Sequence, residues 1–203
     1  VSFAMECYEE GLLSKERADG LELNFGNAKA MVELTRKIAE REGIGDILAE
    51  GPEAAAKWVG PGAEQFVVAV KTQPFPMHEC RTRHGQALGY AVSVTGADHM
   101  HNFWDAGLSR EPLGEGIQSF GAYTAVPQTE LTADKVRAIM PTVNWQWLHN
   151  HLGHCMFIPW SRDQLVELVR GITGWQTNVH ELLRVGERGV TLARVFNLRE
   201  GLT

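Results

Sequence analysis

The repeated helical spacing of apolar residues restricts the fold of this chain more than any other feature. The clearest stripe consists of Met31, Leu34, Thr35 and Ile38. These residues follow the i, i+3, i+4, i+7 spacing of one helix face, and Asn27 precedes them as a predicted N-cap. One stretch alone, FVVAV at 66–70, has the continuous β-branched character of a strand. The sequence therefore predicts a mainly α, multihelical fold with at most a short β element.

Residues that favour helix ends mark further helices. Asp46 is expected to cap a helix, and Pro52 either to kink this helix or to open its second half. Thr132 is expected to cap the run ADKVRAIM, and Pro141 to separate that run from the following helix. The pattern S-x-x-Q at 161–164 predicts a capping box ahead of another helix.

A proline-rich segment divides the chain. The stretch TQPFPMHECR carries two prolines and breaks the helical pattern near residues 71–76. We therefore predict two packed helical domains, residues 1–70 and residues 71–203. A chain of 203 residues that is 44% hydrophobic is long enough to bury the core that such domains need.

Composition excludes several classes of protein. The net charge of −6 and the absence of a basic run argue against a nucleic-acid partner, whose phosphates require clustered Lys and Arg. No apolar run approaches the length of a membrane span. Three widely spaced cysteines suit free or metal-bound thiols in a reducing compartment, so we expect the cytoplasm. Because the chain starts at Val1 within a helical pattern, we expect it to be a fragment of a longer protein.

The stretch WQWLHNHLGHCMF gathers the densest set of metal-capable side chains. His149, His151, His154 and Cys155 fall within seven residues. If the helix continues through them, His151 shares a face with His154 and Cys155. They could bind a metal, and a zinc hydrolase using the three histidines is one alternative. They could equally be core or surface residues.

Two other groups of residues are candidates for chemistry. His99 and His101 are expected where a helix gives way to a loop, and Asp98 could orient one imidazole. The ECR segment at 79–81 carries Arg81, which could contact an oxyanion or a carbonyl substrate. The alternatives are exposed loop histidines and an exposed ion pair.

Several phrases, in this order, resemble the aldehyde ferredoxin oxidoreductase family. They are FAMECYEEGLL, REGIGDILAEG, LGYA, TGADH and VFNLREG. The resemblance extends over nearly the whole chain and corresponds to the two α-helical domains of the family: residues 1–70 match the C-terminal part of its second domain, and residues 71–203 part of its third. It implies a tungsten or molybdenum bis-pyranopterin cofactor, a nearby 4Fe-4S cluster, oxidation of aldehydes or related oxo compounds, and electron transfer to ferredoxin.

The resemblance also implies roles for particular residues. The family motif Asp-x-x-Gly-Leu-Cys matches residues 150–155, so Cys155 is expected to be a cluster ligand and Gly153 and Asn150 to contact the pterin. Asn150 replaces the acid of the motif and His154 its leucine. His99 matches a residue implicated in proton transfer, and His101 stands where a relative has a lysine near the pterin.

Arg81 matches an arginine of the segment that leads to the active site. The β-rich first domain of the family and its remaining cluster cysteines would lie upstream of Val1, since a cluster needs about four thiolates. We therefore expect this chain alone to bind neither cofactor stably. The non-enzyme alternative is a catalytically inactive helical scaffold or partner-binding domain of the same ancestry.

Overall fold

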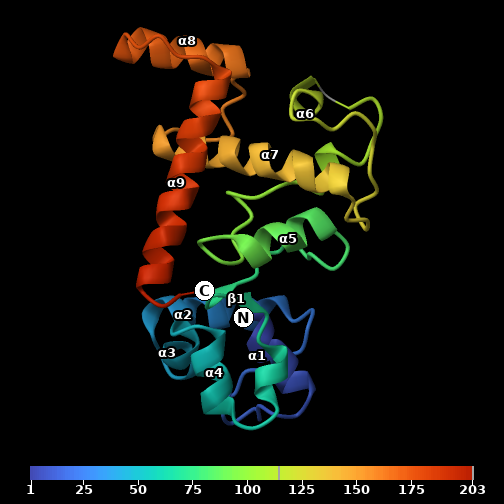
Figure 1. Ribbon diagram of the computed structural model, residues 1–203. Helices are drawn as coiled ribbons and strands as arrows, with labels where there is room; N and C mark the ends of the chain where they lie inside the picture. The colour runs from blue at the N-terminus through green and yellow to red at the C-terminus, as the bar shows by residue number, and fades with distance from the viewer. Residues whose placement is uncertain (114, 203) are drawn as a thin grey trace. The chain divides into compact units, whose positions relative to one another are not determined.

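The computed structural model describes residues 1–113 and 115–202, and helices dominate it (Figure 1). This confirms the prediction of a mainly α fold. The chain divides into two compact units, Val1–Phe75 and Pro76–Thr203. The assignment of each half of the chain to a particular domain of a family remains a prediction. Within the described residues, no helix combines the length and the apolar character needed to cross a membrane.

The first unit packs short helices around an apolar core. Its elements are α1 (Ser2–Glu9), α2 (Ala28–Glu40), α3 (Ile44–Ala49), α4 (Pro52–Val59), the 3-10 helix η1 (Ala63–Phe66), β1 (Ala69–Val70) and β2 (Gln73–Pro74). The Asn27 side chain accepts a hydrogen bond from the Ala30 amide at 3.2 Å, which confirms the predicted N-cap of α2. Met5, Leu34 and other residues of these helices form one buried cluster.

One local prediction for the first unit is confirmed in part and another is wrong. The short β element predicted at 66–70 is present only at Ala69 and Val70, which pair with β2, because Phe66 ends η1. The N-cap of α3 is Gly43 rather than Asp46. Pro52 is the first residue of α4. It therefore opens a new helix, which agrees with one of the two alternatives predicted for it.

The second unit contains the longer helices. Its elements are α5 (His84–Val92), the 3-10 helix η2 (Asp105–Gly107), α6 (Glu115–Gln118), α7 (Ala133–His151), α8 (Arg162–Thr173) and α9 (Val179–Arg199). Thr132 caps α7, and the predicted capping box of Ser161 and Gln164 is present at α8. Helices α7 and α9 cross closely, as Figure 1 shows, where a Cβ on Gly186 would lie 1.9 Å from the carbonyl oxygen of Asn144.

The predicted helix break at Pro141 is wrong, because α7 runs through it. Proline removes one backbone hydrogen bond within a helix. Residues on both sides are nevertheless buried, with Ala138 and Ile139 in one apolar cluster and Leu148 in another. Packing at both ends of α7 outweighs the local cost of the proline.

A buried ion pair joins the start of α7 to η2. The Lys135 ammonium lies 2.8 Å from Oδ1 of Asp105, and neither side chain is exposed. The Asp105 carboxylate also accepts hydrogen bonds from the amides of Gly85 and Gln86. It thereby compensates the positive end of α5. Asp105 thus ties the C-terminal end of the segment that carries His99 and His101 to the starts of α5 and α7.

Candidate functional site

Most of the predicted site residues lie in two segments of the second unit. His99 and His101 lie in the segment between α5 and η2, and Asn150, Gly153 and Cys155 lie at the end of α7 and just beyond it. Within the described part of the chain, no hydrogen bond, ion pair or ring contact joins His99 to Cys155. A third segment, before α5, carries Arg81.

His99 lies in a small aromatic cluster. Its ring centroid is 4.4 Å from that of His78 and 5.7 Å from that of Trp104, and His78 is 4.7 Å from Trp104. Burial lowers the pKa of His99 below its usual value, and the neighbouring His78 lowers it further. The neutral imidazole therefore dominates at pH 7. Sequence reasoning missed His78 and Trp104, because no local pattern indicates that the three rings meet.

His101 connects its loop to α7. Its Nδ1 contacts the carboxylate of Asp98, which confirms that Asp98 orients one of the two imidazoles. Its ring centroid lies 4.8 Å from Trp147, and Trp147 lies 5.9 Å from His151. A Cβ on Gly189 would lie 1.7 Å from the His151 ring, so glycine in α9 is what makes room for this imidazole.

The end of α7 separates Cys155 from the helix. The helix ends at His151, and Gly153 adopts a φ of 69° in the left-handed region. The idea that His151 and Cys155 share a helix face is therefore wrong, since the chain reverses between them. Cys155 is a free cysteine in an exposed position. The Asn150 amide donates to the carbonyl of Gln146 at 3.2 Å.

Two histidines of the cluster contact each other directly. Nδ1 of His149 lies 2.8 Å from Nε2 of His154, and Nδ1 of His154 lies 3.0 Å from the carbonyl oxygen of Cys155. Burial lowers the pKa of His149 to about 4, with a smaller contribution from His154. Within the described residues, no three His, Cys, Asp or Glu side chains converge as metal ligands. The geometry therefore offers no support for the zinc-hydrolase alternative.

Arg81 forms an exposed ion pair with Glu79. The guanidinium Nη2 lies 2.7 Å from the Glu79 carboxylate, and the Arg81 side chain is 86% exposed. Pairing with Glu79 raises the pKa of Arg81, so its charge is permanent. Solvent screens an exposed pair of this kind, so Arg81 can leave Glu79 for another anion at little cost.

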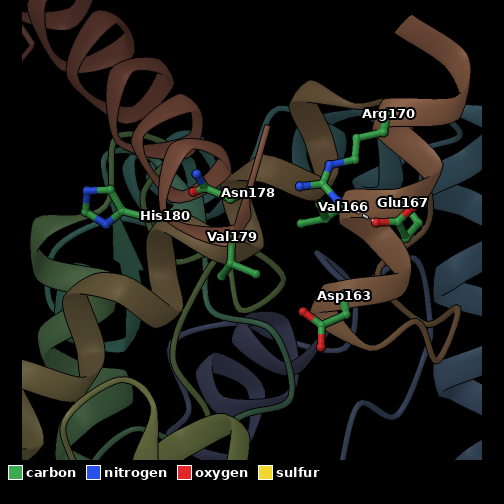
Figure 2. Close-up of a pocket in the computed structure, with 7 residues that line it drawn as sticks. All are labelled: Asp163, Val166, Glu167, Arg170, Asn178, Val179 and His180. Atoms are coloured by element: carbon green, nitrogen blue, oxygen red, sulfur yellow. Dashed lines mark hydrogen bonds and ion pairs between the residues drawn. The ribbon is translucent and has the colours of Figure 1, made fainter. Parts of the chain in front are cut away.

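A surface pocket lies elsewhere in the unit, between α8 and the start of α9 (Figure 2). It has a volume of about 430 Å³. It is lined by Asp163, Val166, Glu167, Arg170, Asn178, Val179 and His180. Figure 2 shows Arg170 directed to Glu167, with which it pairs at 2.6 Å. None of the predicted site residues lines this pocket.

Comparison with known proteins identifies the family. The family model described as "Aldehyde ferredoxin oxidoreductase, domains 2 & 3" matches residues 1–203. The chain belongs to the aldehyde ferredoxin oxidoreductase family. This confirms the resemblance noted in the sequence.

Curated relatives of the aldehyde ferredoxin oxidoreductase family are much longer than this chain. The tungsten-containing aldehyde ferredoxin oxidoreductase of Pyrococcus abyssi (strain GE5 / Orsay) is 32% identical over 204 residues, which cover 98% of this chain and 32% of that protein. An aliphatic sulfonate oxidoreductase, WOR-like subunit, of Pyrococcus furiosus is 41% identical over 105 residues, which cover 49% of this chain and 17% of that protein. The chain thus spans about a third of the length of its tungsten-containing relatives.

A solved structure shares the fold of this family member. It is the "Active site complex BamBC of Benzoyl Coenzyme A reductase in complex with 1,5 Dienoyl-CoA". One of its chains matches with a TM-score of 0.64 and 23% identity, covering 99% of this chain and 35% of that chain. This similarity concerns the fold alone.

Proposed function

We propose that this chain is the C-terminal part of an oxidoreductase that oxidises aldehydes or related oxo compounds and passes the electrons to ferredoxin. The observation that supports this most directly is the family match over the whole chain, with tungsten-containing aldehyde ferredoxin oxidoreductases among its relatives. The rest of the enzyme would include a β-rich N-terminal domain, which this chain does not contain. A tungsten or molybdenum bis-pyranopterin would supply the redox chemistry, and a 4Fe-4S cluster the path for electrons.

The position of Cys155 fits a cluster that is shared with another domain. A 4Fe-4S cluster needs about four thiolates, and a single chain segment that supplies one of them must present it at its surface. Cys155 is free and exposed, whereas Cys7 is buried and Cys80 is half-buried. Burial raises the pKa of Cys7 and of Cys80, which disfavours their thiolates. Cys155 is therefore our proposed cluster ligand.

His99 is our proposed catalytic residue for proton transfer. Its imidazole is held by ring contacts with His78 and Trp104, so its orientation is restricted before substrate arrives. Because burial and His78 both lower its pKa, it is neutral at pH 7 and able to accept a proton released as the substrate is oxidised. A proton acceptor in a fixed orientation contributes roughly 10²- to 10⁴-fold to such a reaction.

The remaining predicted residues are proposed to bind the pterin or the substrate and to take no part in the chemical step. The Asn150 amide nitrogen is engaged with Gln146, so its oxygen is the atom available to a pterin amine. His101 uses Nδ1 for Asp98, which leaves Nε2 for the pterin. The left-handed backbone at Gly153 allows close approach. Arg81 would exchange Glu79 for an anionic or carbonyl oxygen of the substrate.

A cytoplasmic location is part of this proposal. All three cysteines are free, although a disulfide would form readily between suitably placed thiols in an oxidising compartment. Ferredoxin, the proposed electron acceptor, is a partner of the whole enzyme.

The test uses the complete gene product that contains this chain. It would be purified without oxygen from cells supplied with tungstate, and its tungsten, molybdenum, iron and pterin content measured together with aldehyde-dependent reduction of ferredoxin. We expect C155S to lose the cluster and H99N to keep both cofactors while kcat falls at least about 100-fold.

Two results would overturn the proposal. A complete gene product that contains neither pterin nor iron, and does not reduce ferredoxin, would favour the scaffold alternative. Tungsten and a full cluster retained by the isolated chain would contradict the expectation that it supplies only some of the ligands.

A further inference from the structure

The backbone at the end of α7 forms a Schellman motif that leads directly into Cys155. The amide of His154 donates to the carbonyl of His149 at 3.2 Å, and the amide of Gly153 donates to the carbonyl of Asn150 at 3.0 Å. This pair of bonds, with Gly153 in the left-handed region, defines the motif. It places the side chains of His149 and His154 next to each other.

Schellman motifs usually place an apolar contact where these two histidines lie. Here the contact is a hydrogen bond of 2.8 Å between Nδ1 of His149 and Nε2 of His154. The second ring nitrogen of His154, Nδ1, forms a hydrogen bond of 3.0 Å with the carbonyl oxygen of Cys155. The same carbonyl accepts the amide of Ile158 at 3.2 Å. A chain of hydrogen bonds thus runs from a buried residue of α7 to the backbone of Cys155.

The direction of these bonds follows from the chemistry of the acceptor. A carbonyl oxygen can only accept, so Nδ1 of His154 carries the hydrogen. In neutral His154 the other nitrogen, Nε2, is then an acceptor, and Nδ1 of His149 must donate to it. Burial keeps His149 neutral at pH 7, which is compatible with this role.

The side chains of this segment are largely exposed. Cys155 and Phe157 are exposed, the latter to 74%. A Cβ on Gly153 would meet no atom within 4 Å. His149, in contrast, is only 7% exposed and lies with its ring centroid 5.9 Å from Trp145. The hydrogen-bonded histidines therefore connect an exposed turn to the packed part of α7.

We propose that His149 and His154 are positioning residues, which hold the backbone of Cys155 through this hydrogen-bond relay so that its thiol meets the iron-sulfur cluster in a fixed geometry. This inference rests on the proposed function, in which Cys155 is a cluster ligand. It gives a role to His149 and His154, for which the family resemblance supplies none.

The first experiment measures amide hydrogen exchange of Ile158 in the complete gene product that contains this chain, with two variants of His149. H149F fills the buried space but cannot donate a hydrogen bond. H149N leaves space unfilled but places an amide N–H near the position of Nδ1. We expect H149F to exchange about tenfold faster than the parent chain, and H149N to remain within about twofold of it, because a lost hydrogen bond of ordinary strength corresponds to roughly a factor of ten. H180F, on the exposed face of α9, is the control and should change nothing.

If His149 only fills space, the order reverses, with H149N exchanging faster than H149F. That order, or equal rates in the two variants, overturns the relay. H154L provides a second check at the other ring, since leucine suits the apolar contact of an ordinary Schellman motif but cannot reach the Cys155 carbonyl. It should therefore accelerate exchange as H149F does.

The second experiment separates this inference from the proposed function. In the complete, cofactor-loaded protein, the EPR signal of the reduced cluster and its survival in air are compared for C155S, H149F and H149N. We expect C155S to lack the signal, H149F to lose its cluster about tenfold faster than the parent, and H149N to match the parent. If C155S lacks the cluster signal but the cluster of H149F survives in air as long as that of the parent, the relay is overturned and Cys155 remains the proposed ligand. A retained signal in C155S overturns the ligand role, while amide exchange still decides whether the relay holds the turn.

Discussion

Replacing Lys135 by methionine should destabilise the second unit strongly. The Lys135 ammonium has hydrogen-bond partners in Asp105 at 2.8 Å and in the carbonyl oxygens of Pro127 and Gln128 at 2.6 and 3.3 Å. Both carbonyl oxygens also accept a backbone amide, from Glu130 and His84 respectively, so neither loses its last partner in K135M. The group that loses its charged partner in K135M is the buried Asp105 carboxylate, which keeps only the amides of Gly85 and Gln86.

The expected magnitude follows from that carboxylate. Removing one partner of a buried ion pair costs about 3–5 kcal/mol, because the other charge remains buried without compensation. For a denaturant dependence of about 2 kcal/mol per M, this lowers the urea midpoint by roughly 2 M. The double variant D105N/K135M buries no charge, so it should lose less stability than the sum of the two single variants.

Urea unfolding followed by tryptophan fluorescence measures this effect, because five of the six tryptophans lie in the second unit and only Trp58 lies in the first. R137M is a matched control on the same helix, since Arg137 and Asp134 form an exposed pair. It should leave the midpoint unchanged within error. A K135M midpoint equal to that of R137M, or strict additivity in the double variant, would refute this reasoning.

Three further predictions concern packing and protonation. G186A should lower the free energy of unfolding in urea by about 1–3 kcal/mol, because the new Cβ would meet a backbone carbonyl of α7. G171A is its control: a Cβ there would meet no atom within 4 Å, so this variant should be neutral or stabilising. The pKa of His149 is about 4 in the folded chain against 6.5 for an unperturbed histidine, so the unfolded chain binds more protons between these values. The contribution of His149 should therefore lower the free energy of unfolding by at most about 3 kcal/mol from pH 6.5 to 4, and this contribution should be absent in H149N. In the complete enzyme, kcat/KM should fall as the pH drops through the lowered pKa of His99. H78N should raise that pKa, so the fall in kcat/KM should begin at a higher pH. An unchanged pH profile in H78N would exclude His78 as a cause of the lowered pKa.

Helix starts were predictable from the sequence because their signals are local. Asn27 and Thr132 each accept a hydrogen bond from an amide three residues ahead, so the cap and its partner are close in the chain. The capping box at 161–164 is contained within four residues. The family was also recognisable from the sequence, because short motifs follow one another in the order that the family has, and the family model matches residues 1–203.

The wrong or partly confirmed predictions arose where packing overrides a local preference. Pro141 favours a helix end, yet buried residues on both sides keep α7 continuous. The stretch 66–70 has strand character, but within the described residues only Ala69 and Val70 of it pair with another strand. Cys155 lies outside the helix because Gly153 reverses the chain just before it.

The sequence by itself determined the helical class, several helix starts, the family and the identity of the candidate residues. Tertiary structure decided which of these residues meet. His78 lies 21 positions before His99 and Lys135 lies 30 after Asp105, yet each pair is in contact. Such contacts depend on how the helices pack, and side-chain spacing along the chain carries no information about partners that only packing brings together.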